Sequence, residues 1–137
     1  MNDLARRRMS PTQWLNFDAL GVLVFVTIGR DQHNESDAVG GILRTAAPFL
    51  LAMFVGWVIA RAWRQPDSWR TGLITWGVTL VLGMILRRVF WDRGTAAAFV
   101  MVAAAFLALT MLSWRAVSRA VHRRLAQVDL ADDDHHP

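Results

Sequence analysis

The chain has 137 residues, of which 54% are hydrophobic and only 19% charged, with a formal net charge of +4. A soluble domain usually carries about 25% charged residues, and the apolar residues here form long runs, so the composition argues against a soluble globular protein. The absence of cysteine excludes a disulfide framework, a thiol nucleophile and a cysteine-based metal site.

The first predicted helix covers about residues 11–30. Ser10 at the cap, Pro11 at the first helical position and Gln13 three residues after the cap form a capping-box pattern. The apolar core of this helix, 19–28, is short, and Asp18 interrupts its early part. Tilt, a thinner bilayer or burial by neighbouring helices would have to compensate for that length.

The second predicted helix covers about residues 42–63, after a polar loop. Pro48 lacks a backbone donor and predicts a kink in the first third of this helix. Ala52, Gly56 and Ala60 recur every four residues, and small residues at that spacing let two helices approach closely. We expect this face to pack against another helix, either within the chain or across a dimer.

Two more helices are predicted, at about 69–89 and 95–125. The last one is uncharged from Thr95 through Trp114, and its amphipathic continuation is expected to lie on the membrane surface. We expect the tail, 126–137, to be disordered.

Four segments therefore approach the roughly 20 mostly apolar residues needed to cross a bilayer. A soluble four-helix protein of this length could not bury three such helices on every side. The sequence predicts an all-α fold, an integral membrane four-helix bundle forming a single domain over 1–137, placed in the cell's inner (plasma) membrane. We expect no cleaved signal peptide, because the first apolar run lacks a small-residue cleavage site.

All 15 basic residues are Arg, and they flank the apolar runs. Codon bias in a GC-rich genome or a preference for bidentate anion contacts would each explain the absence of Lys. This arrangement suggests topological anchors, so no nucleic-acid partner is predicted. With an even number of spans, ten Arg fall on the side of the termini and five on the other side. Because Arg is enriched on the cytoplasmic side, both termini are predicted to be cytoplasmic.

Asp18 is the first candidate for a functional role, because an ionisable group inside a membrane helix costs at least about 2.5 kcal/mol at the helix centre. In one interpretation it is a carboxylate that exchanges protons or cations. In the other it is an interfacial Asp paired with an Arg of the same side, such as Arg61 or Arg115.

Further polar candidates gather on the opposite side: Arg30, His33, Arg44, Arg87 and Arg88. Of these, Arg44, Arg87 and Arg88 would form an electropositive vestibule for an anion or a lipid headgroup, or would simply snorkel to the lipid–water boundary. The alternating acidic and imidazole groups of 31–37 resemble a cation loop but lack the Gly and Glu of an EF-hand. No metal site is predicted.

Several short segments, in this order and spacing, carry a family resemblance. They are Phe17-Asp18, Ile28-Gly29-Arg30 with His33, the stretch 43–49, Gly56-Trp57, and the stretch 83–88 with Gly94-Thr95 and Phe99-Val100. Over roughly residues 14–120 the chain resembles the actinobacterial and haloarchaeal membrane family known as domain of unknown function 3054. The resemblance implies a small four-helix membrane protein of a prokaryote and brings no activity with it.

Three functions remain open at this point. The first is a small transporter or channel working as a homo-oligomer, with Asp18 exchanging protons. The second is a structural or accessory membrane subunit that assembles through the Ala52, Gly56 and Ala60 face. The third is an intramembrane enzyme or lipid-binding protein that uses Arg44, Arg87 and Arg88. Since no nucleophile–base pair, phosphate loop or metalloprotease motif occurs, we expect no enzyme and no cofactor.

Overall fold

The computed structural model of the chain describes residues 9–31, 38–91 and 97–133. It contains four helices, α1 (Pro11–Asp31), α2 (Ala38–Ala60), α3 (Trp69–Trp91) and α4 (Ala97–Asp133), and these ranges hold no strand. The all-α prediction is confirmed. The helix bounds lie within a few residues of the predicted ones, except at the end of α4.

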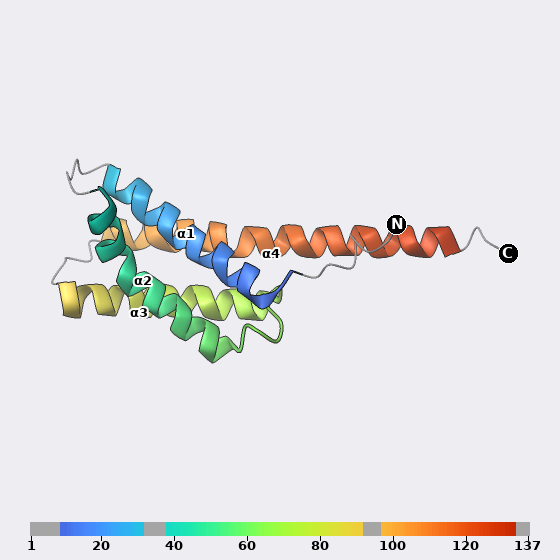
Figure 1. Cartoon of the computed structure of the whole chain (residues 1–137), viewed down its shortest axis with the longest axis horizontal. Coiled ribbons are helices and arrows are strands. Elements are labelled where there is room, and N and C mark those ends of the chain that lie inside the picture. Colours follow the sequence, from blue (N-terminus) through green and yellow to red (C-terminus); the bar gives the residue numbers. More distant parts are fainter. Residues whose placement is uncertain (1–8, 32–37, 92–96, 134–137) are drawn as a thin grey trace.

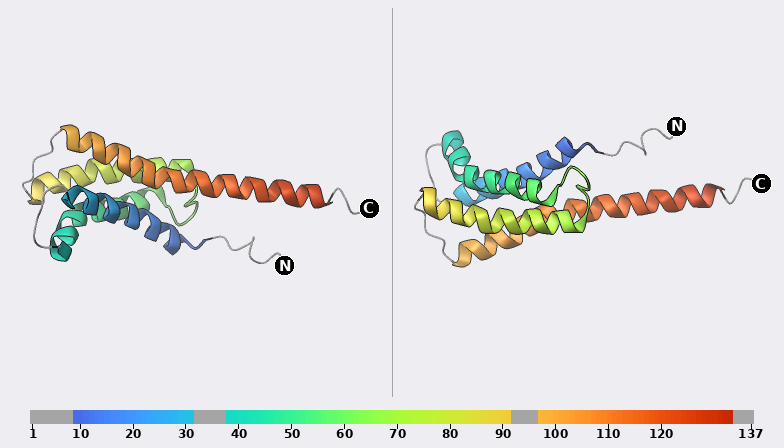
Figure 2. Two further views of the ribbon diagram at one scale, coloured as in Figure 1. Left: turned by 90° about the horizontal axis from the view of Figure 1, so that it is seen from above. Right: turned by 90° about the horizontal axis from the view of Figure 1, so that it is seen from below.

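The four helices run roughly along the long axis of the molecule (Figure 1). Each packs against its two neighbours, α1 against α2 and α4, and α3 against α2 and α4, with the most extensive packing between α2 and α3. The start of α1, the α2–α3 connection and the far part of α4 all lie toward the same end of the bundle (Figure 2). Residues far apart in sequence therefore meet at that end.

All four helices are long and apolar enough to cross a membrane. Most of their apolar residues nevertheless face outward, since only 17% of the α3 span and 39% of the α2 span are buried inside the bundle. Exposed side chains as large as Phe54, Val81 and Leu109 would be costly in water. Lipid must cover this surface, and the chain is a four-helix membrane bundle.

The predicted capping box does begin α1. The backbone N–H of Ser10 donates to Gln13 Oε1 at 2.8 Å, and the backbone N–H of Gln13 donates to Ser10 Oγ at 3.3 Å. Both partners of the motif are thus engaged, which satisfies donors that the first turn of a helix leaves free. This cap fixes where α1 starts and hence the depth of Asp18 along it.

The end of α2 differs from the prediction, because the helix stops at Ala60 and not at Trp63. Arg61 adopts a left-handed backbone with φ of 49°. The backbone N–H of Arg61 donates to Val58 O, and that of Ala62 donates to Trp57 O. These are the two bonds of a Schellman motif, which usually places Gly at the left-handed position. The sequence gives no such Gly, so the stop was not foreseen.

The small-residue face of α2 packs against α3 within the chain. Ala52 is fully buried, and a Cβ added at Gly56 would lie 3.2 Å from the Cα and the carbonyl oxygen of Thr75. Glycine thus allows the two backbones to approach closely, as its spacing suggested. Of the two arrangements that the pattern allowed, the structure has the one inside the chain.

At the other end of the bundle the core is aromatic. The Phe25 ring of α1 lies 5.9 Å from Phe49 of α2, and 5.8 and 5.7 Å from Phe99 and Phe106 of α4. Helix α3 comes close here because Gly83 has no side chain to separate it from Phe49. These contacts join all four helices without a polar group.

The tail was expected to be disordered from 126 to 137, whereas α4 continues to Asp133. Its extension also leaves the bundle in line with the rest of the helix (Figure 1). No Gly or Pro occurs between Thr95 and His136, so nothing in the backbone interrupts the helix. Residues 134–137 lie outside the described part.

Two glycines of α3 provide a test of this packing. A Cβ at Gly83 would lie 2.6 Å from Phe49 Cδ1, whereas a Cβ at Gly77 meets nothing within 4 Å. Gly83→Ala should therefore lower the free energy of unfolding by about 1–3 kcal/mol through overpacking. Gly77→Ala should be neutral or raise it by up to about 1 kcal/mol, because Ala is the better helix former. Equilibrium unfolding in mixed micelles measures both, and equal effects would contradict the packing.

Candidate functional site

Asp18 of α1 and Arg115 of α4 form a buried ion pair. Arg115 NH1 donates to Asp18 Oδ1 at 2.9 Å and NH2 donates to Oδ2 at 2.7 Å, the two-pronged geometry typical of Arg with a carboxylate. Both side chains are 0% exposed. Of the two interpretations of Asp18, the structure shows the pairing with an Arg of the same end, and the partner is Arg115.

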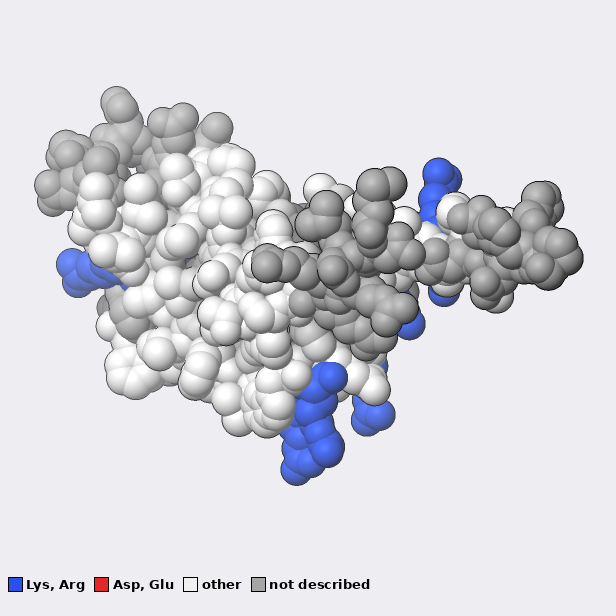
Figure 3. All heavy atoms as spheres, turned by 45° about the vertical axis from the view of Figure 1, so that its right-hand side comes forward, with Lys and Arg blue, Asp and Glu red and all other residues white. Residues whose placement is uncertain are grey.

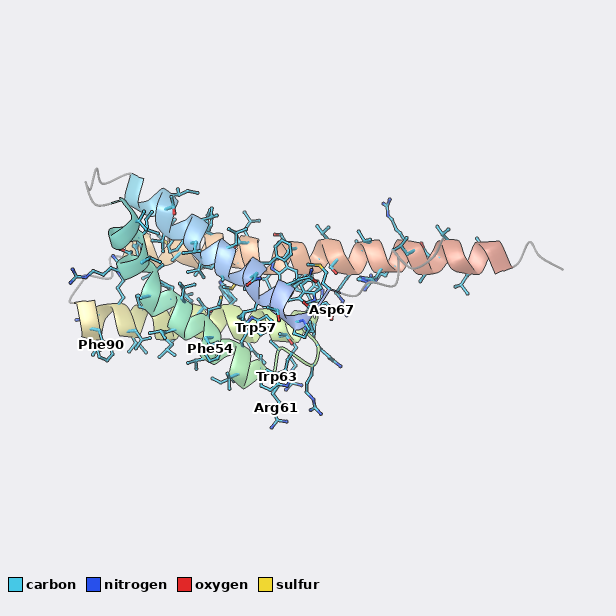
Figure 4. The ribbon with its side chains drawn as sticks, in the orientation of Figure 1. Phe54, Trp57, Arg61, Trp63, Asp67 and Phe90 are labelled. Carbon is cyan, nitrogen blue, oxygen red and sulfur yellow. The ribbon has the colours of Figure 1, made fainter. Side chains whose placement is uncertain are left out.

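Two indole N–H groups complete the shell of the carboxylate. Trp57 Nε1 of α2 donates to Asp18 Oδ2 at 2.8 Å, and Trp114 Nε1 of α4 donates to Oδ1 at 3.1 Å. Trp57 lies on α2 near the first turns of α1 (Figure 4). Each oxygen thus accepts two hydrogen bonds, which fills the roughly four acceptor sites of a carboxylate. No acceptor site is left for an exchanging ion.

The guanidinium of Arg115 also has partners beyond Asp18. Its Nε donates to the carbonyl oxygen of Pro66 at 2.9 Å, and NH1 also donates to Met111 O. Pro66 lies in the α2–α3 connection, so one side chain holds that connection as well as α1. Helix α3 borders the group through Gly72, where a Cβ would lie 2.8 Å from Arg115 Cδ. All four helices therefore meet at this cluster.

Aromatic rings close the cluster on the side of α1. The Arg115 guanidinium lies 4.1 Å from the centroid of the Trp114 ring, a cation–π contact. Trp14 lies 4.0 Å from that same ring and is itself 96% buried, being 4% exposed. The rings exclude water from the charges, and exclusion of water strengthens the electrostatic attraction between them.

A row of threonines continues from this cluster into the bundle. Thr71, Thr75 and Thr79 are buried at four-residue spacing on α3. Thr71 Oγ1 donates to Gln65 O, and Thr79 Oγ1 donates to Thr75 O at 2.6 Å. Thr75 Oγ1 is buried without a hydrogen-bond partner. Thr79 thus bonds back to its own helix, as is common for Thr in such helices, whereas Thr75 does not.

The other predicted polar residues are not part of this cluster. Arg44 and Arg88 are exposed at the opposite end of the bundle. Arg87 is half-buried there, with its guanidinium 4.4 Å from the centroid of the Phe99 ring. His33 and the rest of the predicted cation loop, 32–37, lie outside the described residues, as does the side chain of Arg30. Asp18 contacts none of the described members of this set.

No metal centre is evident in the described ranges, where no three His, Asp or Glu side chains gather.

The roles of Trp57 and Trp114 were missed because Trp near a helix end suggests an interfacial belt, and Trp deeper in a span suggests packing. A signal for the cluster does exist in the sequence. Arg115 is the first charge after the long uncharged run of α4, and it directly follows Trp114.

Asp18→Asn should lower the free energy of unfolding by about 3–5 kcal/mol, because it leaves the Arg115 charge buried without its counter-ion. Arg115→Gln should cost a similar amount, and the double variant much less than the sum of the two. Arg119→Gln, one turn further along α4, is the control and should change stability by less than about 0.5 kcal/mol. Unfolding in mixed micelles measures all four variants, and an Asp18→Asn variant as stable as the control would rule out this account.

Comparison with known proteins gives one family match, and the cluster lies within the matched range. A family model described as "Protein of unknown function (DUF3054)" matches residues 15–118, a range that contains Asp18, Trp57, Trp114 and Arg115. No curated protein and no solved structure matches the chain.

Proposed function

This chain belongs to the family of proteins of unknown function DUF3054, and we propose that it is a structural or accessory membrane subunit, neither a transporter nor an enzyme. The observation that carries the proposal is the filled shell of the Asp18 carboxylate. A group that exchanges protons or cations needs a free acceptor site and a path for water. Asp18 is 0% exposed and accepts four hydrogen bonds, so its chemistry fits a permanent helix clamp.

Opening the clamp would be costly. Separating Arg115 from Asp18 leaves two uncompensated charges in a dry site, at about 3–5 kcal/mol for the loss of either partner. The same motion would break the bond from Arg115 to Pro66 O and the two indole bonds. A rigid scaffold has no need for such a motion, whereas an exchanger would repeat it in every cycle.

The surface through which the subunit assembles is not the small-residue face of α2. That face is occupied by α3, since Gly56 lies directly against Thr75. The proposal therefore assigns assembly to lipid-facing side chains. Each helix offers such positions, for example Leu20, Leu51, Val81 and Leu109, all at least half exposed.

A small transporter or channel is the second candidate, and the buried hydroxyl of Thr75 favours it. With Thr71 and Thr79 it forms a row of polar groups on the inner side of α3, and its Oγ1 has no acceptor. A transient water or ion would find a partner there. In this alternative Asp18 has to leave Arg115 during each cycle.

Proton flux separates the two candidates. Vesicles loaded with a pH-sensitive dye and carrying the wild-type protein should dissipate an imposed pH gradient at the rate of protein-free vesicles. The Asp18→Asn variant should behave in the same way, because the structural proposal gives Asp18 no part in proton movement. A wild-type flux that is retained in Arg119→Gln but lost in Asp18→Asn would overturn the structural proposal in favour of the transporter.

Cross-linking tests the accessory role itself. Because the chain has no cysteine, single-cysteine variants at Leu20, Leu51, Val81 and Leu109 report one position each. A photoactivatable thiol reagent in native membranes should give a discrete product of higher mass from at least one of these helices. The fully buried Ala103→Cys variant is the control and should give none. The absence of any product from all four exposed positions would contradict assembly.

We further propose that both termini face the cytoplasm and that the protein resides in the plasma membrane. Support comes from the ten Arg that the chain places on the side of its termini, against five on the other. A Gln127→Cys variant, on the exposed extension of α4, should react with a membrane-impermeant maleimide only after the cells are opened. Labelling of intact cells would reverse the orientation.

A further inference from the structure

The connection between α2 and α3 borders a half-open cavity of about 620 Å³ at the surface of the bundle. Three of its lining side chains are cationic, namely Arg61, Arg64 and Arg70. The remaining wall combines uncharged polar groups with the apolar side chains of Ile59 and Ile74. The cavity lies at the end of the bundle that carries the Asp18 cluster, but Arg115 does not line it. It is thus a separate site, at the opposite end from Arg44 and Arg88.

The three cations of this cavity have no counter-ion in the described part of the chain. The one described ion pair there joins Asp18 to Arg115, and Asp67, in the same connection, is not paired with any of the three. In Figure 3, Arg side chains project from this region, and no acidic side chain is visible among the described residues of that face. Three like charges around one cavity repel one another, and a bound anion would relieve that repulsion.

The backbone of Arg61 adds a second indication. Its left-handed conformation, with φ of 49°, is the position at which helix ends usually carry Gly. A residue with a Cβ is held there at a cost of about 1 kcal/mol or more. The Arg61 side chain points away from the bundle at the end of α2 (Figure 4), and Arg61 lines the cavity. The residue that ends α2 is thus also one of the three cations of the cavity.

The start of α3 contributes donors to the same place. Ser68, Arg70 and Thr71 line the cavity, and the helix begins at Trp69. The first N–H groups of a helix have no partner within it and carry a partial positive charge, which favours anions. The guanidinium groups and the helix end therefore present the same sign of charge to the cavity.

The apolar wall indicates which kind of anion fits. Ile59 and Ile74 border the cavity on the membrane-spanning parts of α2 and α3. Trp63 and Trp69, both more than 40% exposed, flank the connection as Trp does at the lipid–water boundary. A ligand with a phosphate group and acyl chains would contact the Arg side chains and the isoleucines at once.

We propose that this cavity binds a phosphate group through Arg61, Arg64 and Arg70, and that the anionic phospholipid of the surrounding bilayer supplies it. Arg engages phosphate through two parallel N–H bonds, which gives both strength and orientation. Inorganic phosphate offers the same chemistry from solution, so the test separates the two sources. The inference does not rest on the accessory role, because a transporter could hold the same lipid.

The test compares two variants with equal loss of charge. In the pocket variant, Arg61, Arg64 and Arg70 are each replaced by Gln. In the control, Arg119, Arg123 and Arg124 of the α4 extension are replaced by Gln, and these do not line the cavity. Each protein is placed in nanodiscs of equal phosphatidylglycerol and phosphatidylcholine, and the lipid that stays bound after release into detergent is identified by native mass spectrometry.

The wild type and the control should retain phosphatidylglycerol in preference to phosphatidylcholine. In the pocket variant, the preference for phosphatidylglycerol should be about tenfold lower, which corresponds to a loss of about 1.4 kcal/mol of binding free energy. A single Arg64→Gln variant, at an exposed position, should give a partial loss and guards against misfolding of the triple variant. A circular-dichroism melting curve for every variant shows that the bundle is intact.

A second arm uses lipid-free protein in detergent, titrated with inorganic phosphate and followed by ³¹P line broadening. One outcome is that the ³¹P signal broadens with the control and not with the pocket variant, while the nanodiscs show no lipid preference. That result would support the phosphate site and indicate that the phosphate comes from solution. If the pocket variant and the control behave alike in both arms, the proposal is overturned.

Discussion

A carboxylate that is removed from water needs hydrogen-bond donors from the protein, and Asp18 finds four of them on two other helices. Trp57 comes from α2, and Trp114 and Arg115 come from α4, so the position of α1 is set by groups as many as 97 residues away. Arg115 extends the constraint to Pro66 in the α2–α3 connection. In lipid, where apolar burial gives little drive for helix association, such polar contacts help determine how the helices pair.

The two ends of the bundle are held together by different physical means. At the Asp18 end, charge-assisted hydrogen bonds dominate, and aromatic rings shield them. At the other end, Phe25 packs among Phe49, Phe99 and Phe106. Helices α2 and α3 approach closely at Gly56, next to Trp57, and at Gly83, beside Phe49. Hydrogen bonds are directional and therefore select one arrangement of the helices, whereas dispersion contacts mainly fill the space between the helices. The polar end is therefore the part that defines the fold, and the proposed phosphate cavity lies beside it.

Hydropathy and capping patterns predicted the number and type of the helices, because both depend on local sequence. The same patterns led to Asp18, since an acidic residue inside a span is conspicuous. They left the choice between Arg61 and Arg115 open, because the spacing of residues in the sequence does not show how two helices 97 residues apart are aligned. They also missed the stop after Ala60, where Arg61 takes a conformation that glycine usually adopts, and the length of α4, where charged residues suggested disorder but proved compatible with a helix.

The central claim, that water does not reach the Asp18 carboxylate, is tested most directly by hydrogen exchange of the indole N–H groups in lipid nanodiscs. The account predicts that the indole signals of Trp57 and Trp114 persist after transfer to D₂O, because both protons are held by Asp18. The signal of Trp63, which is 52% exposed, should disappear at once. Exchange of Trp57 and Trp114 as fast as that of Trp63 would show a hydrated carboxylate and contradict the account.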